Sequence, residues 1–341
     1  MRNLVLLLIV SLALASNAVA ADDLRKEAFE SDLRPIPSDR AILNKLIGNP
    51  DKKQVELGKK LFFDPRLSKS GLISCNTCHN LATGGVDGVA SAIGHKWTSN
   101  PHNLGSPTVY NAVFSSVQMW DGRFPDLEEQ AKGPISAGPE MASPPELVVE
   151  RIKSIPAYVQ EFKRAFPKDK DPATFDNVAR AIAAFERTLV TPSRFDKFLN
   201  GDDKALTKKQ RSGLKVFIAK GCVGCHTGIG VGGGSMQPFP MTDNPYKYAN
   251  IGDFKGNKEG LVKVPTLRNI TQTAPYFHNG AVWSLKEAVR IMGKTQLDAD
   301  LSDNEASDIV AFLGSLKGKK PSITYPVLPE STDETPRPDA E

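Results

Sequence analysis

Two short motifs contain every cysteine of this 341-residue chain, and a histidine directly follows each cysteine pair. One motif ends at His79 and the other at His226. Cys-x-x-Cys-His is the attachment sequence of c-type haem, because two thiols at this spacing can add to the two vinyl groups of one porphyrin. The adjacent histidine can then bind the iron as its proximal ligand. The sequence therefore predicts two covalently bound haem c groups, attached through Cys75, Cys78, Cys222 and Cys225.

Zinc sites and thioredoxin-like dithiols also use paired cysteines. A single zinc ion would require both pairs to meet at one metal, although the two motifs lie 147 positions apart in the sequence. A redox-active dithiol does not require a histidine after each pair. Both alternatives therefore explain less of the pattern than haem attachment does.

The first twenty residues predict export from the cytoplasm. Arg2 supplies a positive charge, an apolar run follows from Leu4 to Ala15, and residues 18–20 read Ala-Val-Ala. This is the layout of a secretory signal peptide cleaved after Ala20, with an uncleaved anchor as the alternative. No later segment has the roughly 20 apolar residues that a membrane span needs. We therefore expect a protein of the periplasm without a membrane span. The periplasm is the compartment in which c-type haem is attached after translocation.

The composition excludes several other classes of protein. Hydrophobic residues make up 40% and charged residues 24% of the chain, which is ordinary for a globular protein and unlike a disordered one. The formal net charge is only +4 and no basic block stands out, so no nucleic-acid partner is expected. Four cysteines are too few for a disulfide scaffold.

Similar segments surround the two haem motifs. Residues 58–62 precede the first motif and residues 213–217 precede the second, and each segment predicts a helix that leads into its haem site. Each half also closes with an apolar helical stripe of the same spacing. The two stripes are Ile182, Phe185 and Leu189 in the first half, and Ile309, Phe312 and Leu316 in the second.

Local signals predict where these closing helices begin. Asp171 and Pro172 are typical of an N-cap and first helical position, so the first closing helix is expected to start there. Ser302 and Glu305 have the spacing of a capping box at the start of the second.

The repeat predicts a mainly α fold with two cytochrome c-like haem domains related by duplication. The expected divisions are a signal peptide at 1–20, an N-terminal domain at 21–195, a C-terminal domain at 196–320 and a tail at 321–341. The tail is rich in proline and has no helical period. It is expected either to lack fixed structure or to pack back across the other domain.

The second axial ligand of each iron decides between catalysis and electron transfer. His95, His102 and His278 remain after the two proximal histidines. His95 lies in a glycine-rich segment, where a ligand could bind and leave as the loop moves, although a lone loop histidine is often an ordinary surface residue. Met292 falls in a helix expected at 284–292, where methionine serves either as a ligand or as core packing.

The sequence resembles the bacterial di-haem cytochrome c peroxidases from about residue 35 to about residue 320. The resemblance includes middle segments that single-haem cytochromes lack. The matching segments are residues 57–64, 106–112, 120–123, 126–135, 140–141, 264–269 and 273–280, which read LGKKLFFD, SPTVYNA, WDGR, DLEEQAKGPI, EM, VPTLRN and TAPYFHNG.

The resemblance implies different roles for the two haems. The N-terminal haem would be the low-potential peroxidatic centre, with His79 proximal and His95 distal in the resting state. The C-terminal haem would be the high-potential relay, bound by His226 and Met292. Trp120 would lie between them on the electron path, although an aromatic at this position could also be simple core packing.

The resemblance also implies a substrate and partners. Hydrogen peroxide would be reduced to water beside Glu140, the distal carboxylate, with Gln130 next to it. A small c-type cytochrome or a copper protein would donate electrons, and the chain would form a homodimer. The His95 loop would release the first iron after the second haem is reduced, and so act as a gate.

A calcium ion is implied between the domains. Its ligands would be Asn103 and the backbone carbonyls of Thr273 and Pro275. The family usually places this asparagine two residues before the proline of the S/A-P-T segment, whereas Asn103 stands four before Pro107. This departure weakens the assignment of Asn103.

Two rival functions remain open. A related di-haem enzyme matures a tryptophan-derived quinone on a partner protein, but it carries tyrosine where Met292 stands and lacks an equivalent of His95. A pure electron carrier would keep both irons closed by two axial ligands. Glu140, Gln130 and the glycine-rich His95 segment argue against that carrier.

Overall fold

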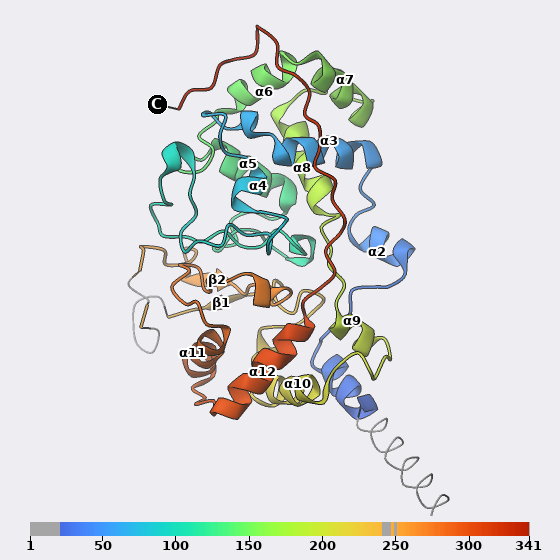
Figure 1. Ribbon diagram of the computed structural model, residues 1–341, viewed down its shortest axis with the longest axis vertical. Helices are drawn as coiled ribbons and strands as arrows, with labels where there is room; N and C mark the ends of the chain where they lie inside the picture. Colours follow the sequence, from blue (N-terminus) through green and yellow to red (C-terminus); the bar gives the residue numbers. More distant parts are fainter. Residues whose placement is uncertain (1–20, 241–246, 249–250, 341) are drawn as a thin grey trace, which may run out of the picture.

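The computed structural model describes residues 21–240, 247–248 and 251–340, so the predicted signal peptide lies outside the described residues. Helices and loops dominate, and the only strands in this part of the chain are β1 (Met236–Pro238) and β2 (Leu261–Lys263), which pair antiparallel. The first half contributes α2 (Arg40–Leu46), α3 (Lys52–Phe63), α4 (Cys75–Cys78), α5 (Leu127–Ser136), α6 (Pro145–Lys153), α7 (Pro156–Ala165) and α8 (Phe175–Glu186). The second half contributes α9 (Arg194–Leu199), α10 (Lys208–Ala219), α11 (Leu285–Leu297) and α12 (Asp303–Ser315) (Figure 1). No helix among these is long and apolar enough to cross a membrane.

In the first half, α3 crosses α8 at a glycine. A Cβ atom on Gly58 would overlap the backbone carbonyl of Ala181, so only glycine lets the two helices approach this closely. One turn further along α3, Phe62 packs edge-on against Phe185 with 5.3 Å between ring centroids. Both rings are buried in the first hydrophobic core. The crossing therefore buries the apolar stripe that the sequence predicts.

The second half repeats this crossing with equivalent residues. A Cβ atom on Gly213 would overlap the carbonyl of Asp308, where α10 crosses α12. Four residues after that glycine, Phe217 packs against Phe312 with 5.2 Å between ring centroids. The same glycine and the same phenylalanine pair thus recur at matching positions. The mainly α fold with two duplicated cytochrome c-like domains is confirmed.

The two closing helices test the predicted helix starts. The capping box at the start of α12 is confirmed, since Ser302 N–H donates to Glu305 Oε2 at 2.9 Å and the Ser302 hydroxyl accepts from Glu305 N–H. The predicted start of α8 at Asp171 and Pro172 is wrong. The helix begins at Phe175, because the Thr174 hydroxyl accepts from the N–H of residue 177 and serves as the N-cap.

The N-terminal segment of the described chain packs into the second core. Residues 21–30 form a helix. Leu24 and Leu33 are buried there together with Phe195 and Phe312. In Figure 1 this segment lies beside α9 and α10, at the far end of the molecule from α6 and α7. The division of the chain at 195/196 stays a prediction.

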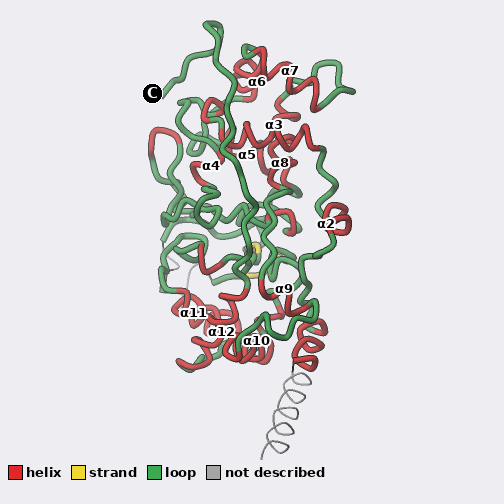
Figure 2. Tube along the Cα trace, turned by 45° about the vertical axis from the view of Figure 1, so that its right-hand side comes forward, coloured by secondary structure: helices red, strands yellow, loops and turns green. Residues whose placement is uncertain are grey.

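The C-terminal tail, residues 321–340, leaves the second half and packs on the first half (Figure 1). After α12 it crosses the molecule as an extended loop and ends beside the first half, near α6, in both views (Figures 1 and 2). Tyr325 meets the ring of Phe63 at 4.9 Å between centroids, and Ile323 packs against the first core. Of the two alternatives for the tail, packing back across the other domain is the one observed. We call this segment the strap.

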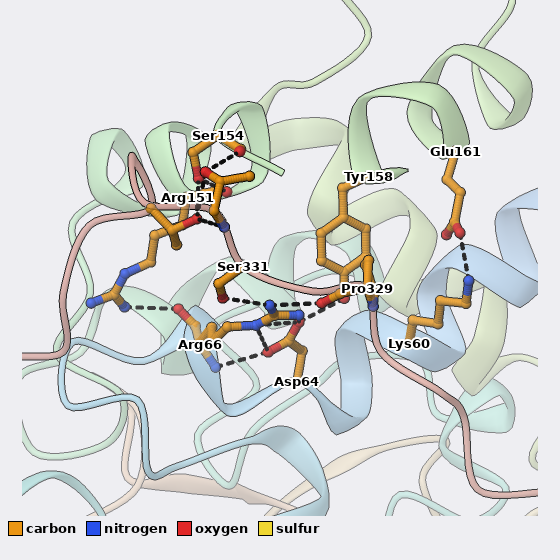
Figure 3. Close-up of polar contacts among 11 residues, drawn as sticks. Lys60, Asp64, Arg66, Arg151, Ser154, Tyr158, Glu161, Pro329 and Ser331 are labelled. Carbon is orange, nitrogen blue, oxygen red and sulfur yellow. Dashed lines mark hydrogen bonds and ion pairs between the residues drawn. The ribbon is translucent and has the colours of Figure 1, made fainter. Parts of the chain in front are cut away.

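Polar contacts fix the strap to the first half (Figure 3). The Arg66 guanidinium donates to the carbonyl of Pro329 at 2.8 Å and to the hydroxyl of Ser331 at 2.9 Å. The guanidinium of Arg151 is buried and donates to the carbonyl of Arg337 at 3.2 Å. These donors bond backbone carbonyls of a chain that has no regular secondary structure of its own, which gives the strap a defined path.

Candidate functional site

The first haem motif forms the short helix α4 and ends at a half-buried histidine. The Nδ1–H of His79 donates a hydrogen bond to the carbonyl oxygen of Pro107 at 2.9 Å. Burial lowers the pKa of His79, so the ring is neutral at physiological pH. This hydrogen bond leaves Nε2 with a free lone pair, the state in which histidine binds a metal. The ring is thus prepared as a proximal ligand.

The second motif is built in a similar way. Cys222 to Gly224 forms a turn of 3-10 helix after a left-handed glycine, and His226 follows as a buried ring. Burial lowers the pKa of His226 to about 4, against the opposing effect of the backbone at Val231 and Pro265. Pro265 occupies the place in its Pro-Thr segment that Pro107 occupies in the first half. The duplication therefore extends to the environment of the two histidines.

The four cysteine thiols fit haem attachment better than the alternative chemistries. None is in a disulfide. Burial raises the pKa of Cys78 to about 12 and that of Cys222 to about 11, whereas a redox-active dithiol needs a lowered thiol pKa. In the part of the chain that the structure describes, no group of three or more His, Cys, Asp or Glu side chains could hold a metal ion. The described residues therefore offer no cluster of zinc ligands.

A continuous cavity joins the two motifs. It is lined by His79 from the first motif and by Cys222, Cys225 and His226 from the second. Its wall is mainly apolar, as a porphyrin requires. The residues present therefore fit two haem groups, each held by its pair of cysteines and its histidine.

The main chains of the predicted distal ligand and the predicted distal carboxylate are hydrogen-bonded to each other, although neither residue lines the cavity itself. The backbone N–H of His95 donates to the carbonyl of Glu140 at 2.7 Å. Gly94 permits this approach, because a Cβ atom there would overlap the carbonyl of Pro139. The same loop reaches the haem motif, since the Cys78 thiol lies 3.7 Å from the carbonyl of residue 93. Two segments that are 45 residues apart in sequence are thus joined beside the first motif.

The side chains of these two residues carry the chemistry that a distal site requires. His95 is buried, and its Nδ1 has no hydrogen-bond partner within the described residues, so the protein alone leaves this ring nitrogen unsatisfied. Burial raises the pKa of Glu140, while the charge of Arg123 partly opposes the shift. A raised pKa makes a carboxylate a better proton acceptor, as a general acid–base group requires.

Three other predicted residues, unlike His95 and Glu140, line the cavity directly. Trp120 donates from its indole N–H to the carbonyl of Gly105 at 3.0 Å, which fixes its ring. Gln130 lies on α5 with its amide 3.8 Å from the sulfur of Met119. Met292 lies on α11, whose N-cap is Ser284 as the predicted start of that helix requires, and it faces the second half of the cavity.

The three predicted calcium ligands do not all lie at the cavity. Thr273 and Pro275 line the cavity, whereas Asn103 does not. Asn103 has a left-handed backbone and lies against Gly252, where a Cβ atom would approach its own at 3.1 Å. The structure gives no contact between Asn103 and either carbonyl, so the calcium site stays a prediction.

Three polar residues at this cavity were not predicted as site residues from the sequence. They are Glu186, Lys263 and His278. Glu186 is buried at the end of α8, and burial together with nearby Glu128 raises its pKa to about 8. Lys263 is buried on β2, and His278 packs its ring against Trp120 at 6.4 Å. A lysine directly before the Val-Pro-Thr segment, and a glutamate ending an apolar stripe, were the signals available in the sequence.

Comparisons with known proteins agree with this site. A sequence profile described as di-haem cytochrome c peroxidase matches residues 52–204, and one described as cytochrome c matches residues 210–317. The cytochrome c551 peroxidase of Pseudomonas aeruginosa is 50% identical over 337 residues, which cover 96% of each chain. The methylamine utilization protein MauG of Methylorubrum extorquens is 35% identical, over 81% of this chain and 82% of its own.

A solved structure shares the fold. A MauG-like protein associated with microbial copper homeostasis superposes with a TM-score of 0.69 at 26% identity, covering 79% of this chain and 90% of its own. The duplicated helix crossing, the two haem-attachment motifs and the near-complete match to a cytochrome c551 peroxidase lead to one conclusion. The chain belongs to the family of di-haem cytochrome c peroxidases, and it is an enzyme of that class.

Proposed function

We propose that the chain reduces hydrogen peroxide at its N-terminal haem and receives the electrons through its C-terminal haem. The observation that carries this proposal is the main-chain hydrogen bond between the N–H of His95 and the carbonyl of Glu140. It holds a candidate distal ligand next to a candidate acid–base residue. A pure electron carrier has no use for a titratable carboxyl group at that position.

Glu140 performs the proton transfer in this proposal. Peroxide reduction consumes two electrons and two protons and yields two water molecules, and the haems, when bound, supply the electrons. The Glu140 carboxylate accepts a proton from the inner peroxide oxygen and returns it to the outer one, so that water can leave. Its raised pKa makes both directions of this transfer accessible. Gln130, which lines the cavity from α5, orients the substrate.

His95 controls access in this proposal. In the resting state its ring would bind the first iron and exclude peroxide. The loop would withdraw this ring once the second haem is reduced, which would make the loop a two-state element governed by redox state. Gly94 is the residue that lets this loop lie so close to Glu140.

The remaining assignments complete the proposal. His226 and Met292 bind the high-potential haem, and Trp120 carries electrons between the two sites. The donor is a small c-type cytochrome or a copper protein, and the functional unit is a homodimer. Calcium is held by Asn103 and the carbonyls of Thr273 and Pro275, since amide and carbonyl oxygens suit this hard cation. The signal-like sequence of residues 1–20 supports a periplasmic location.

The test is peroxide consumption by purified holoprotein with a reduced cytochrome c donor, with and without prior one-electron reduction. Turnover only after reduction supports the full proposal. Turnover without reduction supports the peroxidase and removes the gate. No turnover in either state, with both haems loaded, would leave the electron carrier as the better description.

A further inference from the structure

Lys263 is a buried cation with no acidic partner in the described chain. Its residue is only 8% exposed, and it lines the cavity between the two haem motifs. The other lysine on this wall, Lys220, pairs with Glu305 at 2.7 Å. No carboxylate of the described residues lies within ion-pair distance of the Lys263 ammonium, and Asp121, which attracts it from further away, is paired with Arg123 at 3.0 Å.

This arrangement is costly in the protein alone. Burying a charged ammonium group without a counter-charge is strongly unfavourable, unless the group gives up its proton. Burial does lower the pKa of Lys263, to about 8. The lysine still carries its charge at neutral pH, so an anion in the cavity next to Lys263 would stabilise it.

The backbone holds Lys263 in place next to Trp120. Its N–H donates to the Trp120 carbonyl at 2.8 Å, and on β2 it pairs in register with Met236 of β1. The side chain therefore projects from a fixed strand at the boundary between the two halves. The groups that fill this cavity are the two haems, and each haem carries two propionates. The propionates are the only anionic substituents of these groups.

We propose that the Lys263 ammonium pairs with a haem propionate in the inter-domain cavity and positions that propionate beside Trp120. Lys263 is then a positioning residue that sets the potential of one haem. The pair neutralises a negative charge close to the iron, which favours the reduced state. The proposal depends on haem loading and not on peroxide chemistry, so it can be tested even if the proposed function fails.

The experiment is a spectroelectrochemical titration of both haems in the parent holoprotein and in Lys263→Met. We expect the midpoint potential of one haem to fall by at least a tenfold change in its reduction equilibrium, which is 59 mV for one electron. Lys263→Arg keeps the charge and should keep both potentials. Lys258→Met removes an exposed lysine five residues away and should change neither.

Each contrary outcome overturns the proposal. If Lys263 pairs with a small free anion and not with a propionate, the anion leaves when the lysine charge is removed. Lys263→Met would then keep the parental midpoint potentials. Equal shifts in Lys263→Arg or Lys258→Met would show that packing or overall charge, and not a specific pair, was responsible. If Lys263→Met does not retain two haems per chain, Lys263→Gln is titrated in its place with the same expected fall.

Discussion

Asn111 and Asn269 donate hydrogen bonds from their side-chain amides to the same oxygen, the hydroxyl of Thr191, at 2.8 and 2.9 Å. Both asparagines have a left-handed backbone with φ of 62°. Each backbone N–H donates to a carbonyl just beyond the closing helix of its own half, that of Leu189 for Asn111 and that of Leu316 for Asn269. The two copies of the duplicated fold therefore meet at one side chain.

Thr191→Val should destabilise the protein markedly. Thr191, Asn111 and Asn269 are essentially inaccessible to water, so the substitution leaves two buried amide donors without an acceptor. The cost is about 2 kcal/mol or more. Urea unfolding of the holoprotein measures it, with Thr191→Ser as a control that keeps the oxygen. Equal midpoints for the two variants would contradict this account.

Gly213→Ala should disrupt the crossing of α10 and α12. The new methyl group would overlap the backbone carbonyl of Asp308, which cannot move away as a flexible side chain could. We expect a loss of about 3 kcal/mol or more in the free energy of unfolding. Gly314→Ala, on α12 with no heavy atom within 4 Å of its Cβ position, is the matched control and should be neutral or slightly stabilising. Comparable losses in both variants would disprove the steric explanation.

Glu140→Gln should retain both haems but lose peroxide turnover. The amide cannot accept the proton from the inner oxygen, and general acid–base groups contribute about 10²- to 10⁴-fold. Steady-state peroxide consumption measures the effect at equal haem content. Glu146→Gln, an exposed glutamate six residues later, should behave like the parent. Full turnover in Glu140→Gln would remove this residue from the proposed mechanism.

His95→Gly should make the fully oxidised enzyme active without prior reduction. The substitution removes the proposed distal ligand and leaves the first site open. Activity is compared before and after one-electron reduction, and the absorption spectrum reports the ligation state. His102→Gln changes an exposed histidine that pairs with Asp253, and should leave the requirement for reduction intact. If oxidised His95→Gly is as inactive as the oxidised parent, His95 is not the gate.

Glu186 should make stability depend on pH. Its pKa is about 8 in the fold against 4.5 in the unfolded chain, so the folded state binds the proton more tightly. This contribution is complete below the unfolded value and is lost as pH rises through the folded value, at about 1.4 kcal/mol per pH unit. Urea unfolding at pH 5 and pH 8 should show the loss in the parent and not in Glu186→Gln. Exposed Glu150→Gln should keep the parental pH dependence, and an unchanged dependence in Glu186→Gln would contradict the assignment.

The sequence predicted the parts of this protein that depend on local spacing. Each haem motif spans five consecutive residues, and each apolar stripe spans about two turns of one helix. The start of α8 was misplaced because Asp171 and Thr174 both suit an N-cap, and only packing selects Thr174. The contact between His95 and Glu140 joins distant segments, so only resemblance to a family could suggest that they share a site. Lys263 stayed hidden because a lysine is ordinarily exposed, and its burial depends on the whole inter-domain cavity.

The two ends of the chain are exchanged between the halves. Residues 21–33 complete the core of the second half, and the strap covers the first half, which is made earlier. The first half therefore gains its final cover from residues at the other end of the chain. A polypeptide cut between 195 and 196 would yield two fragments, each lacking a segment carried by the other. The exchange thus couples the completion of both haem domains into a single assembly event.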